Sequence, residues 1–201
     1  MEVRNEMLLK KILKIVIPVI VVGILVFTII QIVFPIKAEI DHIECVTWDA
    51  TYDTLVAYAE QVESGNYDPN TLFIHSYDGI KSENHSDYMN VYVYINVKNL
   101  SLFSNYTVDA AISEIEGYET NVLFSHTASE MFSNNIEALS NQGILVRMDI
   151  FVGDLSEDEI RQLVKATKIK IVANRGMFGN YEKEISLSGC DNITIENILS
   201  N

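Results

Sequence analysis

The chain has few cysteines and few positive charges, and each shortage excludes a class of protein. Two cysteines in 201 residues allow at most one disulfide bridge, so a scaffold held together by several bridges is excluded. Fourteen Lys and Arg residues stand against 28 Asp and Glu residues, for a net charge of −14. Binding to nucleic acid needs clustered Lys and Arg to replace the counterions of the phosphates. The charge balance therefore argues against a nucleic-acid partner.

The signatures of common catalytic and cofactor sites are also missing. There is no G-x-S-x-G nucleophile elbow, no phosphate-binding loop and no dinucleotide-binding fingerprint. The four histidines are scattered, without an H-x-x-x-H or C-x-x-C pairing, so we predict no zinc site. These histidines are His42, His75, His85 and His126. The sequence predicts no catalytic, cofactor-binding or metal-binding residues, and a protein that is not an enzyme.

One segment, residues 15–34, has no charge at all. Sixteen of its twenty residues are Ile, Val, Leu or Phe. A helix of this length spans roughly 30 Å, the thickness of the hydrocarbon core of a bilayer. Insertion should be favourable by roughly 5 to 9 kcal/mol. We therefore expect a transmembrane helix over residues 15–35 that contacts the lipid bilayer, with Pro18 in its first turn and Pro35 at its end.

The residues on either side of this segment predict its direction. Four basic residues precede it, whereas Lys37 beyond it lies among Glu39, Asp41 and Glu44. The positive-inside rule makes residues 1–14 a cytoplasmic tail and leaves the rest of the chain outside the cell membrane. A cleaved signal peptide is the alternative, but the apolar run is long for one and no small-x-small cleavage site follows it.

Residues 39–201 form the predicted exterior domain, which is long enough to bury one hydrophobic core. Without residues 1–36 the chain holds 10 basic and 26 acidic residues, a net charge of −16. This charge argues against electrostatic adhesion of the domain to an anionic membrane surface. Cys45 and Cys190 lie near the two ends of the domain. An oxidising exterior would permit a disulfide between them, and two separate core cysteines are the alternative.

Alternating patterns predict that the exterior domain is mainly β. In residues 88–98, YMNVYVYINVK, aliphatic side chains take one face of a strand and tyrosines and asparagines take the other. We expect the aliphatic face in the core and the tyrosine row packed against neighbouring strands, a binding surface being the alternative. Residues 143–153 predict a second long strand. Shorter strands are expected at 39–48, 71–77, 105–115, 119–127, 131–139, 167–173, 181–188 and 192–198.

Two segments change to a helical period. Residues 51–65 carry apolar residues at helical spacing and end on Gly65, a suitable residue for a helix carboxyl terminus. Ser156 and Glu159 form an S-x-x-E capping box that opens a second helix. The acidic residues there lack the alternating spacing of a calcium loop. Many strands with few helices favour a β-sandwich, because a parallel βαβ fold needs regular helix alternation.

The order of these features resembles a known group of proteins. A basic amino terminus and a single anchor precede a strand-rich domain, in which a long strand, the capped helix GDLSEDEIRQLVKAT and a final run of strands follow one another. This order, over roughly residues 85–200, resembles the membrane-anchored immunoglobulin-like domains of small Gram-positive bacterial proteins. The resemblance implies an Ig-like antiparallel β-sandwich with one or two short helices on the cell exterior. We expect it to bind an envelope component or another membrane protein.

One enzymatic alternative is a sortase-like cysteine transpeptidase, which the chain resembles in size, anchor and β-rich body. Sortases carry a histidine well before a cysteine that ends a T-L-x-T-C motif, with an arginine after it. Here residues 186–190 read SLSGC, and His126 lies 64 residues before Cys190. The mechanism needs a thiolate, a histidine acid/base and a cation for the oxyanion. No Arg or Lys follows Cys190, so this chemistry should fail.

Overall fold

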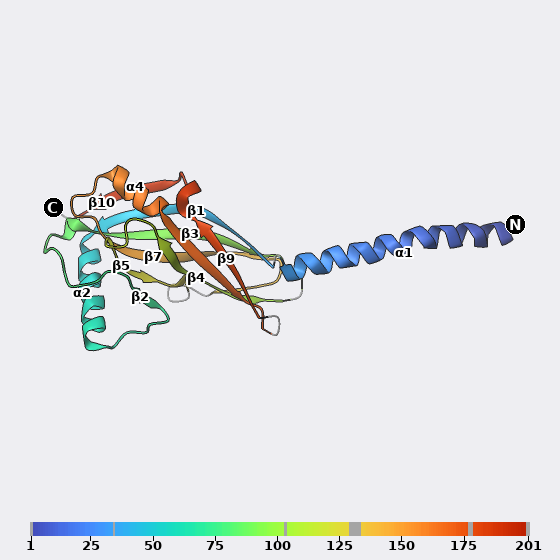
Figure 1. Ribbon diagram of the computed structural model, residues 1–201, viewed down its shortest axis with the longest axis horizontal. Coiled ribbons are helices and arrows are strands. Elements are labelled where there is room, and N and C mark those ends of the chain that lie inside the picture. The colour runs from blue at the N-terminus through green and yellow to red at the C-terminus, as the bar shows by residue number, and fades with distance from the viewer. Residues whose placement is uncertain (1, 34, 103, 129–133, 177–178, 200–201) are drawn as a thin grey trace.

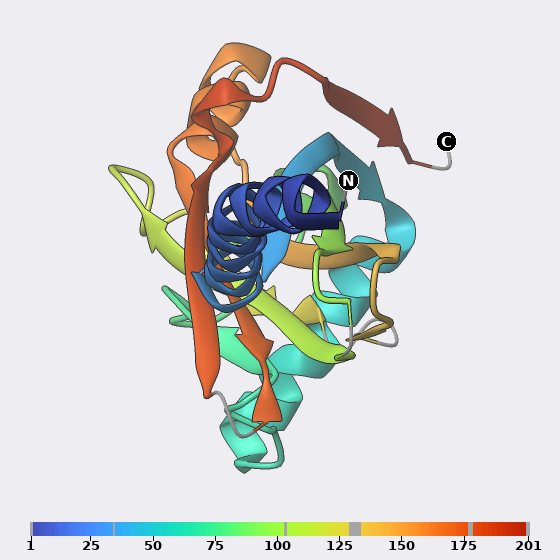
Figure 2. The same ribbon diagram turned by 90° about the vertical axis from the view of Figure 1, so that its right-hand side faces the viewer.

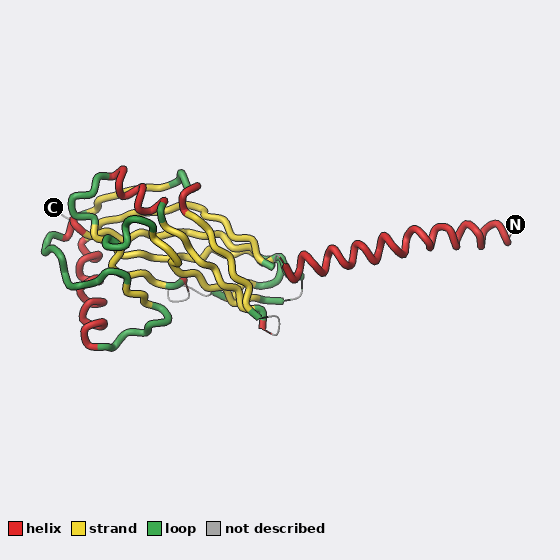
Figure 3. Tube along the Cα trace, in the orientation of Figure 1, coloured by secondary structure: helices red, strands yellow, loops and turns green. Residues whose placement is uncertain are grey.

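The computed structural model describes residues 2–33, 35–102, 104–128, 134–176 and 179–199. A long helix projects from one end of a β-rich domain (Figure 1). The domain consists of two packed sheets of six and four strands, with two further α-helices among the described residues. Figure 3 shows the strands running lengthwise through the domain, toward and away from the long helix.

The long helix α1 spans Glu2–Val33 and ends two residues before Pro35, the residue at which the sequence predicted its end. Its beginning is earlier than predicted, so Pro18 lies inside the helix and not in its first turn. A proline there removes one backbone hydrogen bond to the preceding turn. The apolar window Ile12–Ile29 is not buried against the domain, and by length and composition it could cross a membrane.

The six-stranded sheet has the order β10-β1-β3-β7-β5-β2. All its neighbouring strands are antiparallel except β1 and β10, which run parallel. The expected antiparallel arrangement is therefore wrong at this edge. The chain reaches β10 only after crossing the second sheet, and parallel neighbours need such a long connection. The strands are β1 (Ile36–Trp48), β2 (Leu72–Ile74), β3 (Tyr88–Asn99), β5 (Val122–His126), β7 (Asn141–Phe151) and β10 (Ile193–Ile198).

The four-stranded sheet has the order β6-β4-β8-β9. Its strands are β4 (Tyr106–Ile115), β6 (Asn135–Ile136), β8 (Thr167–Asn174) and β9 (Asn180–Ser186). The main core lies between the sheets and includes the aliphatic side chains of β3, which are buried as predicted. In Figure 1 the four-stranded sheet, with β9 nearest the viewer, lies in front of the six-stranded sheet, and in Figure 2, which looks along α1, β8 and β9 lie toward the left of the domain. The predicted strand at 131–139 is reduced to β6, and residues 131–133 lie outside the described residues.

Both predicted helices of the domain are present. α2 (Asp49–Ser64) ends at Gly65, whose left-handed φ of 72° permits the chain to turn away. α4 (Glu157–Lys165) begins with the predicted capping box. The Ser156 N–H donates to the Glu159 carboxylate at 2.8 Å, and the Glu159 N–H donates to Ser156 Oγ at 3.4 Å.

α2 covers one end of the outer face of the six-stranded sheet and encloses a second, smaller core. Leu55 of α2 packs there with Tyr88, Leu123 and Phe124. The tyrosine row of β3, predicted to pack against neighbouring strands, is therefore covered by a helix at this end. Tyr88 and Asn90 are fully buried under α2, whereas Tyr92 and Tyr94 beyond the helix remain half-buried.

Candidate binding groove

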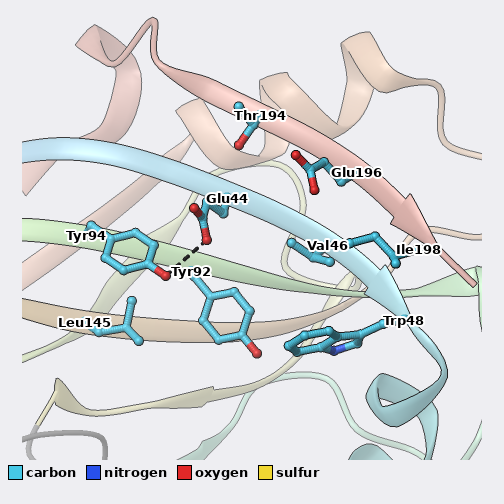
Figure 4. Close-up of a pocket in the computed structure, with 9 residues that line it drawn as sticks. All are labelled: Glu44, Val46, Trp48, Tyr92, Tyr94, Leu145, Thr194, Glu196 and Ile198. Carbon is cyan, nitrogen blue, oxygen red and sulfur yellow. Dashed lines mark hydrogen bonds between the residues drawn. The ribbon is translucent and has the colours of Figure 1, made fainter.

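The outer face of the six-stranded sheet is open where α2 does not cover it. There the strands β10, β1, β3 and β7 form a groove of about 430 Å³ (Figure 4). Its walls combine aromatic, aliphatic and acidic side chains from all four strands. The lining residues are Glu44, Val46, Trp48, Tyr92, Tyr94, Leu145, Thr194, Glu196 and Ile198.

Three aromatic rings form much of the groove surface. Trp48, the only tryptophan of the chain, is 40% exposed, and its ring makes a T-shaped contact with that of Tyr92, with the centroids 6.5 Å apart. The indole N–H of Trp48 donates to the side-chain oxygen of buried Asn90 at 2.9 Å. The third ring, that of Tyr94, stacks on His42 with the centroids 4.1 Å apart. These contacts hold the rings in place, and a fixed aromatic surface can stack with a ligand.

Two carboxylates, those of Glu44 and Glu196, give the groove its charge. The Tyr94 hydroxyl donates to Glu44 Oε2 at 3.0 Å, and His42 Nε2 lies 3.5 Å from the other oxygen of Glu44. Burial and this hydrogen bond to Glu44 raise the pKa of the Tyr94 phenol above its ordinary value. No Lys or Arg is among the lining residues. The groove therefore combines acidic groups with aromatic faces, both of which favour a cation.

A buried polar network lies beside the groove, under α2. Asp149 Oδ1 accepts hydrogen bonds from Arg147 Nε at 2.9 Å, Arg147 Nη2 at 2.7 Å and Asn90 Nδ2 at 2.5 Å. Its other oxygen lies 3.0 Å from His126 Nε2. Burial opposes ionisation of Asp149, but the hydrogen bond with His126 and the charge of Arg147 outweigh it. They hold the pKa of Asp149 below its ordinary value.

The network joins the groove to α2. Asn90 bonds to Asp149 through its amide nitrogen, while its oxygen accepts from Trp48 and from Thr51 Oγ of α2 at 2.9 Å. The Arg147 guanidinium lies 5.5 Å from the ring centre of Tyr58, also on α2. His126 and Asp149 are each only 1% exposed. The network therefore positions Trp48 and the helix, and a substrate in solvent would not reach its ionisable groups.

This network could not be predicted from the sequence. Arg147 and Asp149 occupy alternate positions of a long amphipathic strand, where the pattern indicates a solvent-facing side. Two opposite charges at that spacing could have suggested an ion pair within one strand. Nothing in the sequence indicates that His126, 23 positions away, faces the same carboxylate.

The structure does not bring together His126 and Cys190, the pair that the sortase alternative requires. His126 lies on β5 and Cys190 comes just before β10, and these strands are four positions apart in the sheet. At about 4.8 Å per strand this is a separation of roughly 19 Å. His126 also belongs to the network under α2, whereas Cys190 packs in the core between the sheets.

The two cysteines are separate core residues. Both Cys45 and Cys190 are free and buried. The structure therefore contains two separate core cysteines and no disulfide between them. Burial raises the pKa of the Cys45 thiol to about 12, which leaves it protonated at neutral pH.

The remaining histidines are also apart from one another. His42 lies beside the groove, His75 bonds to Ser125 Oγ at 2.7 Å, and the His85 ring stacks on Tyr52. Within the ranges that the structure describes, no group of three or more His, Cys, Asp or Glu residues is arranged to hold a metal ion.

No protein-family model matches the chain, and no curated protein matches it.

Proposed function

We propose that the protein is a single-pass membrane protein whose immunoglobulin-like, two-sheet domain is a non-catalytic binding module outside the cell. In this proposal residues 15–34 of α1 lie in the bilayer and residues 1–14 remain in the cytoplasm. The exposed apolar helix and the basic residues before it support this arrangement. The ligand is an envelope component or a protein at the membrane, and the groove is its binding site.

The position of the groove carries this proposal. β1 begins at Ile36, next to α1, and ends at Trp48 in the groove. Twelve residues of extended chain span roughly 40 Å, so β1 carries the chain from α1 to the opposite end of the domain (Figure 1), and Trp48 is its last residue. A groove in that position is presented to the space outside the membrane and not to the lipid that surrounds α1.

The chemistry of the groove favours a basic segment of a partner protein. Glu44 and Glu196 attract a Lys or Arg side chain, and the faces of the aromatic rings add a cation–π contribution. The volume of about 430 Å³ falls within the usual range for small-ligand sites. The net charge of −16 outside residues 1–36 also accelerates the approach of a basic partner.

Trp48 provides the test, because the only tryptophan of the chain lines the groove. The full-length protein in lipid nanodiscs is titrated with a short peptide containing Lys and Arg, and with an acidic peptide of the same length. We expect the basic peptide alone to shift Trp48 emission to saturation. The double variant Glu44→Gln, Glu196→Gln should weaken binding by about tenfold.

Glu60→Gln is the matched control, since Glu60 is exposed on α2 away from the groove. It should leave the affinity unchanged. Equal binding by the double variant, or no response to the basic peptide, would contradict the proposal. If Trp48 emission shifted with neutral oligosaccharides and not with either peptide, the ligand of the groove would be a carbohydrate and not a basic segment.

A further inference from the structure

A second surface lies at the other end of the domain, where α1 leaves it. Two leucines in the turns there are exposed, Leu102 at 38% and Leu139 at 57%. The Leu100 N–H donates to the carbonyl of Pro35 at 2.9 Å, and the Leu139 N–H donates to the carbonyl of Ser101 at 3.0 Å. Both turns are therefore tied to the point where α1 meets the domain.

The backbone of Leu139 has an unfavourable conformation. Its φ of 57° is the only positive φ of a non-glycine residue in the described part of the chain. A branched L-residue is disfavoured in this left-handed region, where glycine or asparagine would fit better. The turn nevertheless holds an exposed leucine in this conformation. Strained residues concentrate at functional sites, so this outlier favours a role for the side chain.

Basic residues lie at the same end. Lys37 on β1 and Lys98 on β3 are direct cross-strand partners, a pairing of like charges that is unfavourable by itself and is offset in part by Glu39 beside Lys37. Arg175 follows β8 at this end, because Asn174 pairs with Thr107 near the start of β4.

These basic residues change the local charge. Lys37 forms an ion pair with Glu39 at 2.7 Å, and Glu137 lies in the turn before Leu139. When Lys98 and Arg175 are counted with these residues, the positive and negative charges at this end nearly balance. The whole chain outside residues 1–36, in contrast, carries −16. The negative charge of the domain as a whole therefore does not keep this end away from an anionic membrane.

The connection to α1 is short. α1 ends at Val33 and β1 begins at Ile36. Three residue steps span at most about 11 Å. If α1 lies in a bilayer, the turns with Leu102 and Leu139 are therefore held at the bilayer surface.

We propose that this base of the domain, formed by Lys37, Lys98, Leu102, Leu139 and Arg175, rests on the bilayer that holds α1. Leu102 and Leu139 enter the interface between headgroups and acyl chains, and the three basic side chains meet anionic lipid headgroups. This contact gives the strained leucine and the paired lysines a common function. It rests on the proposed anchoring by α1, and it holds the domain upright with the groove directed away from the membrane.

The experiment uses single tryptophans in the full-length protein with Trp48→Phe as background. Leu139→Trp reports on the base, and Leu102→Trp is a second reporter there. Ile198→Trp is the matched control at the far end, because Ile198 is 56% exposed against 57% for Leu139. Phe27→Trp reports on α1. Each variant is reconstituted into vesicles of phosphatidylcholine and phosphatidylglycerol, with and without bromine on the acyl chains.

We expect brominated lipid to quench Leu139→Trp and Leu102→Trp to an extent comparable with Phe27→Trp, and to leave Ile198→Trp unchanged. Quenching of Phe27→Trp alone would show that α1 lies in the bilayer but that the base does not contact it, which would overturn the proposal. No quenching of any variant would overturn the anchor itself. Equal quenching of Leu139→Trp and Ile198→Trp would mean that the domain lies flat, which also overturns the proposal.

The headgroup contact has a separate readout. Lys37→Gln combined with Lys98→Gln should reduce the quenching of Leu139→Trp in vesicles with phosphatidylglycerol. It should have little effect in vesicles of phosphatidylcholine alone. Unchanged quenching in the anionic vesicles would overturn the role of these lysines.

Discussion

Arg147 and Asp149, two residues apart on β7, form an ion pair within one strand in which two nitrogens of the guanidinium bond to the same carboxylate oxygen at 2.9 and 2.7 Å. Asp149 is 1% exposed and Arg147 is 8% exposed. The pair lies between the groove and α2, and through Asn90 it determines how Trp48 is held.

Asp149→Asn should lower the free energy of unfolding by about 3–5 kcal/mol, because Arg147 then remains buried without its counter-charge. Urea denaturation of the detergent-solubilised protein, followed by Trp48 fluorescence, measures the loss. Asp53→Asn is the control, since Asp53 is exposed on α2, and it should change the free energy by less than about 0.5 kcal/mol. Similar effects of the two variants would show that the buried pair has no special role.

Acid should weaken the fold partly through Asp149. Its pKa in the folded state lies below the ordinary value of 3.8, so its stabilising contribution is complete above that value. The contribution is lost as pH falls from about 4 through the lower folded-state pKa. Unfolding free energies measured between about pH 5 and pH 2 should therefore fall less steeply for Asp149→Asn than for the natural protein. Parallel curves would contradict this assignment.

His75 should add a second pH dependence in a higher range. Burial lowers its pKa below the ordinary 6.5, so below about pH 6.5 the unfolded chain takes up a proton that the folded protein resists. Stability should decline as pH falls from about 7 to 5. His75→Gln can keep a hydrogen bond to Ser125 and should remove this slope. A slope that persists in the variant would assign it to another group.

Ser156→Ala should destabilise the start of α4 and lower the free energy of unfolding by about 0.5–2 kcal/mol, through loss of the capping hydrogen bond to the Glu159 N–H. Amide hydrogen exchange in α4 should become faster. Ser64→Ala, at the exposed end of α2, removes a hydroxyl without removing an amino-terminal cap and should have a smaller effect. The reverse order would contradict the capping assignment.

Leu139→Gly should raise the free energy of unfolding of the detergent-solubilised protein by up to about 1 kcal/mol. Glycine relieves the strain of the left-handed backbone, and its greater freedom in the unfolded chain offsets part of the gain. Gly153→Ala should act in the opposite direction. Gly153 has a φ of 44°, and an added Cβ would lie 2.9 Å from Phe151 Cε1. Denaturation curves of the two variants should shift to opposite sides of the natural protein.

Elements governed by neighbouring residues could be predicted from the sequence. Gly65 ends α2, Ser156 and Glu159 open α4, and the aliphatic face of β3 is buried. These features depend on backbone conformation, a local hydrogen bond and alternation along one strand. The predicted beginning of α1 was wrong because Pro18 can be accommodated inside a helix as well as in its first turn.

Contacts between distant segments could not be predicted in this way. Tyr88 and Asn90 are buried because α2 folds over their end of the sheet, and alternation along β3 gives no sign of that cover. His126 lies beside Asp149 because β5 pairs with β7 in one particular register. A register is selected by the packing of the whole sheet, and a shift of one residue would turn each side chain to the other face.

The sequence by itself determined an apolar helix at the amino terminus, a mainly β domain after it and a strong excess of negative charge, since these follow from composition and period. Only the tertiary structure decided where that charge lies. It gathered Glu44 and Glu196 with aromatic rings at one end, and Lys37 and Lys98 with exposed leucines at the other. Net charge is a sum over the chain, whereas binding depends on which charges the fold places side by side.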